Sequence, residues 1–328
     1  MRGLRMHIVR SNEDQFNILY SNFHNHCCPT ALLSLLDIRF QIEYATDIEY
    51  INRSFLICEK EKVLAAFVAS IQIPTGKMDA FGRDSLYFES PDLDKPEKKQ
   101  IRKALNKELT CLVEDELIQK FTFTDMGANK TISPVVSFFL DKGAVLSNHL
   151  TQIVDLYQTE AELKSDLRKR YKSMINWGLK NLSIQVLDNR NINYLDSEAF
   201  RQLHISVAGR ETRSKKTWDT QFEQVKSGEA FILTGRLDNK LVTCAHFNRT
   251  SKMCFYSVGA SVRELFEKPI SHAILWSAIL YAKEQGCRYF DLGEQLFTSG
   301  TPKEINISKF KRGFGGDCCS HLKLIYKI

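Results

Sequence analysis

Two short strings in the second half of this 328-residue sequence combine residue types that could do chemistry. In Phe310-Lys311-Arg312-Gly313-Phe314-Gly315, cations stand among aromatic residues and glycines, and a lysine ammonium is a compact charge suited to an oxyanion or a phosphate. In the other string, Asp291 and Glu294 flank Gly293, so a carboxylate could accept a proton from an attacking amine or could cap the next turn. We favour the structural role for Asp291 and leave the role of Glu294 open.

A basic loop and a basic helical stretch offer cations to an anionic partner. The stretch from Lys164 to Lys180 has six basic residues against one acid, Asp166, and could be a phosphate or RNA surface or a solvated helix face. The loop could clamp a diphosphate or could simply be solvated. It holds four cations before Trp218, namely Arg210, Arg213, Lys215 and Lys216.

Histidines and cysteines give little support to a metal site. His204, His246 and His272 have no acid at a recognisable spacing, so we expect structural roles for them. The nine cysteines include no Cys-x-x-Cys pair, and the string from His24 to Cys28 has no second ligand pair at a usable spacing. We therefore expect no metal and no cofactor, and the reduced thiols of a cytoplasmic protein.

Composition excludes several classes of protein. Hydrophobic residues make up 43% and charged residues 26%, which is typical of globular proteins and not of disordered chains. No apolar window reaches the roughly 18 residues of a membrane span, and the basic start Met1–Arg5 is not followed by the apolar stretch of a secretory signal. The net charge of +6 is too mild to diagnose nucleic-acid binding, but it allows an anionic small molecule or an RNA end as partner.

Hydrophobic periodicity predicts the same order of elements in each half: strand, helices, three-stranded meander, helix, strand, helix, strand. In the first half we expect strands at 7–9, 55–58, 63–71, 86–88, 121–124 and 149–156, and helices at 14–23, 96–112 and from 133 to about 143. In the second half we expect strands at 183–187, 231–233, 241–247, 254–258, 289–292 and 322–326, and helices at 195–208, 218–225, 271–285 and 307–312. Ser271 would be the N-cap of the helix that Gly286 ends.

The repeated order implies two α/β domains of one fold, each a mixed sheet flanked by helices. We place the join near residue 157, which gives domains 1–157 and 158–328, and the last strand could pack back on the first domain.

With these strings in place, the sequence resembles the FemAB/FemX family of aminoacyl-tRNA-dependent peptidyltransferases of cell-wall precursor synthesis, which are tandem GNAT-fold acyltransferases. Four strings carry the resemblance in the family's order: 167–175, 255–261, 276–293 with its Asp-x-Gly end, and 307–315. The first half resembles the family only in element order. No inserted coiled-coil arm is visible, so the compact FemX-like build fits best.

The resemblance implies a role for several residues. Lys311 would stabilise the oxyanion of amide formation, and the backbone carbonyl of Phe310 would position the amine. The donor would be aminoacyl-tRNA or another activated acyl donor, and the acceptor an amine of a nucleotide-linked cell-wall or cell-surface precursor. The diphosphate of that precursor would bind Arg213 or, second, Arg210. The full set of substrate-binding candidates is Arg213, Tyr256, Arg210 and Glu294.

CoA is disfavoured as the donor. Acetyl-CoA-dependent GNAT proteins usually carry a Gln/Arg-x-x-Gly-x-Gly/Ala loop before the main helix, whose N–H groups cradle the pyrophosphate. Segments 263–269 and 89–96 have no glycine there and contain acids that would repel phosphate.

Three functions stay open from the sequence, and the FemX-like aminoacyl transferase leads. The second is a CoA-dependent N-acyltransferase that acts on an amino sugar in surface polysaccharide synthesis. The third is a non-catalytic GNAT-fold module that binds RNA or a partner.

Overall fold

A computed structural model describes residues 6–126 and 131–327, so the basic start Met1–Arg5 lies outside the described residues. The chain forms two compact units. The first contains the described residues up to Pro29, those of Leu33–His149 and those from Ser320 on, and the second contains Thr30–Leu32 and Leu150–Cys319. The units therefore divide within strands β9 (Val145–Asp155) and β15 (Asp317–Lys327), whereas the sequence placed a single join near residue 157.

The first unit contains two groups of paired strands. Strands β1, β3, β4 and β7 form an antiparallel sheet in that order. Strands β15, β8, β6, β5 and β2 are neighbours in that order, and only β6 and β8 run parallel. The strands are β1 (Met6–Arg10), β2 (Glu49–Asn52), β3 (Phe55–Glu59), β4 (Lys62–Val68), β5 (Ser70–Ile73), β6 (Lys77–Asp79), β7 (Leu86–Glu89) and β8 (Lys120–Asp125). The helices are α1 (Phe16–Cys27), α2 (Leu35–Tyr44), α3 (Lys95–Val113) and α4 (Pro134–Leu140).

Helix α3 shows how local sequence fixes an element of this unit. Asp94 caps the first turn and exchanges hydrogen bonds with Glu97 in a capping box. Ile101, Leu105 and Leu109 recur every four residues and are fully buried, so they form the apolar stripe that faces the core. The opposite face of α3 stays available for polar side chains.

The second unit is built on one mixed sheet, in which β10, β11, β12, β13, β14 and the second part of β9 are neighbours in that order. Only β13 and β14 run parallel. The strands are β10 (Ser183–Leu187), β11 (Ala230–Leu237), β12 (Lys240–Arg249), β13 (Met253–Ser261) and β14 (Tyr289–Glu294). The helices are α5 (Glu160–Asp166), α6 (Lys169–Asn181), α7 (Tyr194–Ala208), α8 (Lys215–Lys226), the 3₁₀ turn η1 (Arg263–Leu265), α9 (Ile270–Glu284) and α10 (Pro302–Arg312).

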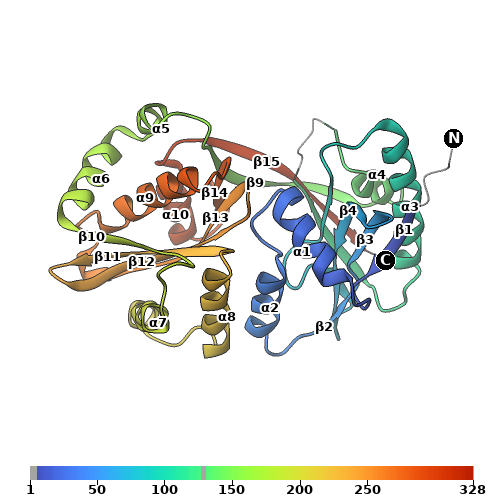
Figure 1. Cartoon of the computed structure of the whole chain (residues 1–328), viewed down its shortest axis with the longest axis horizontal. Helices are drawn as coiled ribbons and strands as arrows, with labels where there is room; N and C mark the ends of the chain where they lie inside the picture. Colours follow the sequence, from blue (N-terminus) through green and yellow to red (C-terminus); the bar gives the residue numbers. More distant parts are fainter. Residues whose placement is uncertain (1–5, 127–130, 328) are drawn as a thin grey trace. The chain divides into compact units, whose positions relative to one another are not determined.

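Helices cover both faces of this sheet because its central strands are apolar on both sides. On β11, Phe231 and Leu233 join the core formed with α6 and α9, while Ala230 and Ile232 join the core formed with α7 and α8. Figure 1 shows α6 and α9 on one side of β10–β12, and α7 and α8 on the other. The unit is thus a helix–sheet–helix sandwich.

The parallel pair β13 and β14 stays together for only three residues. The pairing ends at Phe255 and Asp291, although β13 continues to Ser261 and β14 to Glu294. The two strands therefore separate inside the sheet, beyond Phe255 and Asp291. The candidate site residues described below lie near this point.

Several element predictions are wrong in detail. Ser271 is not an N-cap, because α9 begins at Ile270 after Pro269, and the Ser271 hydroxyl bonds Ser261 instead at 2.8 Å. The helix predicted at 307–312 begins at Pro302, and the strand predicted at 63–71 is two strands, β4 and β5. Helix α2 and strands β2 and β6 were not predicted. The predicted end of the long helix at Gly286 is confirmed by its left-handed φ of 85°.

Across residues 6–126 and 131–327, no helix combines the length and apolarity needed to cross a membrane.

Candidate active site

Lys311 lies in the last turn of α10, half-buried, with its ammonium over Gly293 of β14. A Cβ added to Gly293 would stand 2.9 Å from Lys311 Nζ, so the amine occupies the space that the missing side chain leaves. Gly293 also has a φ of +84°, which disfavours other residues. Within the part of the chain that the structure describes, the Lys311 ammonium forms no hydrogen bond and no ion pair. An ammonium has three N–H donors, and these are left for an acceptor from outside the described residues.

Two acids of β14, Asp291 and Glu294, affect the protonation of Lys311. Burial lowers the pKa of Lys311 below its ordinary value, while Asp291 and the exposed Glu294 act in the opposite direction. Burial raises the pKa of Asp291 to about 6, and its bond from the Gly293 N–H (2.6 Å) and the Lys311 charge only partly offset this. Asp291 therefore caps the turn at Gly293, and above pH 6 it is a carboxylate that favours the ammonium form of Lys311.

The end of α10 is fastened to the start of α6. The Arg168 N–H donates to Gly313 O (2.9 Å), and Arg168 Nη2 donates to Lys309 O (2.9 Å). The Tyr171 hydroxyl donates to Phe310 O at 3.1 Å, and a Cβ on Gly313 would meet the Tyr171 ring at 2.2 Å. Segments 167–175 and 307–315, which are far apart in sequence, thus pack against each other next to Lys311.

Phe310 contributes its ring to an aromatic cluster and its carbonyl to two hydrogen bonds. The ring lies edge-on to His272 (5.2 Å between centroids) and Phe314 (5.2 Å), and it packs with Tyr171 (6.2 Å). The carbonyl accepts from the Gly313 N–H (3.0 Å) and from the Tyr171 hydroxyl (3.1 Å). Both lone pairs are therefore used, and an amine could bind there only in place of the Tyr171 hydroxyl.

Tyr256 and Phe310 line one small cavity, together with the start of α9. The pKa of Tyr256 is raised to about 12 by burial, so its hydroxyl is neutral. A chain of hydroxyls runs along the same wall, from Thr243 to Ser261 (2.9 Å) and on to Ser271 (2.8 Å). The cavity can thus offer polar contacts near the Phe310 backbone.

Arg213 lies in the other layer of the unit, among residues of α7, α8 and β12. Its guanidinium stacks on Trp218 at 3.7 Å from the ring centroid, and its Nη2 donates to Gln221 Oε1 at 2.7 Å. Burial and this positive charge lower the pKa of His246 to about 3 and also lower that of His204. Arg213 is therefore half-buried and held by neighbours.

The rest of the basic loop is more open. Arg210 is exposed, and Lys216 is exposed at the start of α8. Lys215 is paired with Asp219 (3.0 Å) and also contacts Tyr194. The structure thus brings Lys311, Phe310, Tyr256 and Glu294 to one end of the β13–β14 parting, and it places Arg210 and Arg213 in the loop between α7 and α8.

The third of these histidines, His272, lies partly buried in the aromatic cluster around Phe310. Burial lowers its pKa to about 4, so it is neutral at pH 7, and its ring lies edge-on to Tyr171 at 4.6 Å. In the described ranges, no group of three His, Cys, Asp or Glu side chains could hold a metal ion. All nine cysteines are free thiols.

Three solved structures share this fold over almost the whole chain. FemX covers 95% of this chain and 96% of its own, with a TM-score of 0.66 at 14% identity. L-PGS from Bacillus licheniformis covers 94% and 90%, with a TM-score of 0.60 at 13% identity. A tandem GNAT protein from the clavulanic acid biosynthesis pathway covers 98% of both chains, with a TM-score of 0.51 at 12% identity.

Neither the protein-family profiles nor the curated proteins that were compared with this sequence include a match. The structural likeness nevertheless confirms the predicted fold: the chain has a mixed α/β architecture and a FemX-like tandem GNAT fold.

Sequence reasoning gave no role to Tyr171, although it lies in one of the four strings. Its contact with Phe310 joins positions 139 residues apart, and no local pattern signals such a bond. The buried capping role of Asp291, in contrast, was expected from the Asp-x-Gly string.

Proposed function

We propose that the protein forms an amide bond, by transferring an aminoacyl group from aminoacyl-tRNA to an amine of a nucleotide-linked cell-wall or cell-surface precursor. The observation that carries the proposal is the Lys311 ammonium, half-buried over Gly293 and beside the Asp291 carboxylate, with no protein partner in the described chain. The likeness to FemX and to L-PGS supports an aminoacyl donor.

In the proposed step the neutral amine attacks the ester carbonyl of the donor. The new N–C bond forms, the C–O bond to the ribose breaks, and the proton lost by the amine ends on the ribose oxygen. Lys311 faces the oxyanion that develops on the carbonyl, where a fixed charge acts most strongly. The Phe310 carbonyl accepts an N–H of the amine once the Tyr171 hydroxyl gives way, and this aligns the nucleophile.

Exposed cations at the fastened end of α10 suit the phosphates of the donor RNA. Arg168 binds the Lys309 carbonyl through one N–H, and both side chains are exposed. Lys169 and Arg170, which begin α6, are exposed as well. Because such contacts release counterions, donor binding should weaken steeply with salt.

The acceptor is proposed to contact residues from both layers of the unit. Tyr256 and Glu294 would meet the part of the acceptor near the reacting amine. Arg210, which is exposed, and Arg213, which is half-buried beside Trp218, would hold the diphosphate.

The CoA-dependent alternative has less support. The segment before α9 forms the 3₁₀ turn η1 and exposes Glu264 and Glu267, where a pyrophosphate would need free backbone N–H groups.

A transfer assay tests the proposal. The purified chain is given either a mixture of charged tRNAs or acetyl-CoA, together with nucleotide-linked muropeptide and amino-sugar acceptors, and products are read by mass spectrometry. We expect an aminoacylated acceptor with the tRNA mixture only. Acetylated product alone would favour the amino-sugar acetyltransferase, and salt-dependent RNA binding without any product would favour the non-catalytic module.

A further inference from the structure

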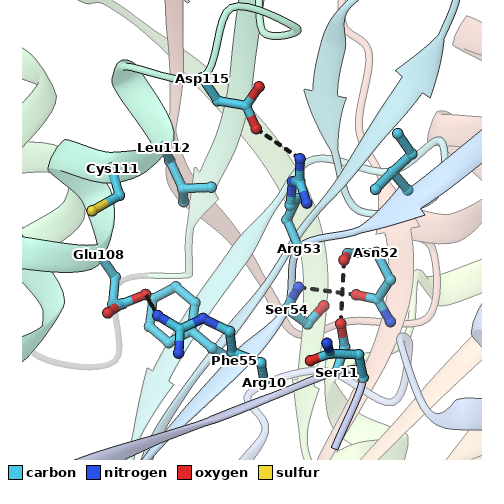
Figure 2. A pocket seen from close by; sticks show the side chains of 12 residues that line it. Arg10, Ser11, Asn52, Arg53, Ser54, Phe55, Glu108, Cys111, Leu112 and Asp115 are labelled. Carbon is cyan, nitrogen blue, oxygen red and sulfur yellow. Dashed lines mark hydrogen bonds and ion pairs between the residues drawn. The ribbon is translucent and has the colours of Figure 1, made fainter.

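A cavity of about 480 Å³ opens in the first unit, and no function discussed so far uses its residues. Its walls are the end of β1, the loop between β2 and β3, and the last turns of α3 (Figure 2). This volume is within the range of small-molecule sites. Its lining residues include Arg10, Arg53, Glu108, Asp115, Phe55 and Cys111.

Two arginines from the strand side are held by two acids from the helix side. Arg10 Nη2 is 2.7 Å from Glu108 Oε2, and Arg53 Nη2 is 2.8 Å from Asp115 Oδ2. Figure 2 shows the two guanidinium groups reaching from β1 and from the loop before β3 toward these carboxylates. The arginine side chains remain 55% and 35% exposed, so the acids fix them without covering them.

The hydrogen-bonding capacity left in the cavity is mainly that of donors. A guanidinium has five N–H groups, and each ion pair uses one of them. Both oxygens of Asp115 are already occupied, by Arg53 and by the Leu117 N–H (3.1 Å). A ligand group that only accepts hydrogen bonds therefore suits this cavity.

The net charge of the cavity and its apolar wall limit the kind of ligand further. The four charged side chains sum to zero, so a single negative charge is easier to place here than a multiply charged phosphate. The planar fork of a guanidinium matches a carboxylate. Ile51, Phe55 and Leu112 supply apolar wall, of which Phe55 is 3% exposed.

We propose that this cavity binds a small organic monocarboxylate, with its carboxylate on the Arg10 and Arg53 guanidinium groups and its apolar part against Phe55, Ile51 and Leu112. The proposal does not depend on the transfer reaction. Such a carboxylate could come from a free α-amino acid, whose ammonium would face Glu108, or from a plain short-chain acid.

Cys111 is an exposed thiol that lines the cavity and reports its occupancy. Alkylation of the full chain by uncharged N-ethylmaleimide is followed at this residue by peptide mass spectrometry, with the exposed Cys318 of the second unit as internal reference. The probes are 4-methylpentanoate, L-leucine and 3-methylbutylamine, which share one apolar body. We expect at least one carboxylate probe to slow alkylation of Cys111 saturably, by about threefold or more, and the amine to have no effect.

The pattern of protection identifies the source of the ligand. Protection by L-leucine alone supports an α-amino acid, and protection by 4-methylpentanoate alone supports a plain acid. Protection by both acids supports a site for carboxylates in general. Protection by neither, or equal protection by the amine, overturns the proposal.

Variants test the two guanidinium groups. Arg53→Lys keeps the charge but loses the fork, so about tenfold more ligand should be needed for the same protection. Arg10→Lys, at the more exposed position, serves if Arg53→Lys does not fold. Arg39→Lys, at an exposed arginine of α2 that does not line the cavity, is the matched control with unchanged protection. Protection that stays unchanged in every folded lysine variant contradicts the assignment.

Discussion

Lys311 at the end of α10 and Arg213 in the loop before α8 are two cations of the same unit with different neighbours. Arg213 is stacked on Trp218 and bonded to Gln221. The Lys311 ammonium, in contrast, has no hydrogen bond or ion pair in the described chain, and it lies over a glycine near the buried acid Asp291. Sequence pattern singled out both for binding an anion. The difference teaches that the availability of a cation is decided by its tertiary neighbours, and the predictions below test this.

The largest effect is expected for Lys311→Ala. Removal of one oxyanion-stabilising group costs on the order of 100-fold or more in turnover, with little change in the melting temperature. Single-turnover transfer kinetics measure it, and Lys303→Ala, an exposed lysine on the first turn of α10, is the matched control. Full transfer activity in Lys311→Ala would remove this residue from the mechanism.

Gly293→Ala should have the second largest effect on turnover, because the new Cβ would stand 2.9 Å from Lys311 Nζ. Displacement of the ammonium should lower turnover by about tenfold or more. Gly286→Ala is the control, since Gly286 has nearly the same φ (+85°) but nothing within 4 Å of its Cβ position. Both variants should lose about 1 kcal/mol of stability to backbone strain. Equal activity in the two would contradict the placement of the ammonium.

Asp291→Asn should shift the alkaline limb of the pH–rate profile to lower pH. The carboxylate raises the pKa of Lys311, so without it the ammonium loses its proton sooner. A limb that stays in place would mean that Asp291 does not support the charge of Lys311.

The same variant should also be more stable than the parent at pH 8. The pKa of Asp291 is raised from an ordinary 3.8 to about 6, so the folded protein binds this proton more tightly than the unfolded chain does. Stability from this group therefore falls as pH rises through that window, and asparagine avoids a cost on the order of 2 kcal/mol. Urea unfolding at pH 8 and pH 4 measures it, and the gain should disappear at the lower pH.

Substitution of the two arginines of the α7–α8 loop should have different effects on acceptor binding and on stability. Arg210→Ala should raise the KM for the acceptor by about fivefold without loss of stability. Arg213→Ala should cost about 1–2 kcal/mol of stability, through the lost stacking and hydrogen bond, besides any effect on KM. An unchanged acceptor KM in both variants would remove this loop from the substrate site.

Tyr171→Phe should have the smallest effect. The ring keeps its packing on Gly313 while one lone pair of the Phe310 carbonyl is released for the amine. We expect a KM for the acceptor that is lower by roughly twofold to fivefold, with kcat little changed. A kcat that falls by an order of magnitude would show instead that the hydroxyl must stay on the carbonyl.

Sequence patterns could predict the second unit better than the first. The long helix ended by Gly286 and the β11–β12 hairpin follow from local periodicity and turn residues. Helix α2 was missed because its apolar residues follow no clear stripe, although Ser34 and Asp37 form a cap that the sequence could have revealed. Ser271 was misread as a cap because a serine before an apolar run has the same local pattern whether or not it finds a distant partner such as Ser261.

The site was predictable where chemistry is local and not where it depends on distant contacts. The Asp-x-Gly turn at Asp291 is local, and so is the string that contains Lys311. Three features of the site arise from packing between elements. They are the space over Gly293 that Lys311 occupies, the hydrogen bond from Tyr171 to Phe310, and the stacking of Arg213 on Trp218. A sequence pattern carries no signal for them.

The most direct test of the central claim restores the charge at one position. Lys311→Cys is assayed for aminoacyl transfer before and after alkylation with 2-bromoethylamine, which builds a lysine-like ammonium there, and the parent chain is treated in parallel because it has exposed cysteines of its own. We predict that the untreated variant loses on the order of 100-fold in turnover and that treatment recovers the rate to within about tenfold of the parent. A folded variant that is fully active before treatment, or that stays inactive after complete aminoethylation, would contradict the role of the Lys311 ammonium.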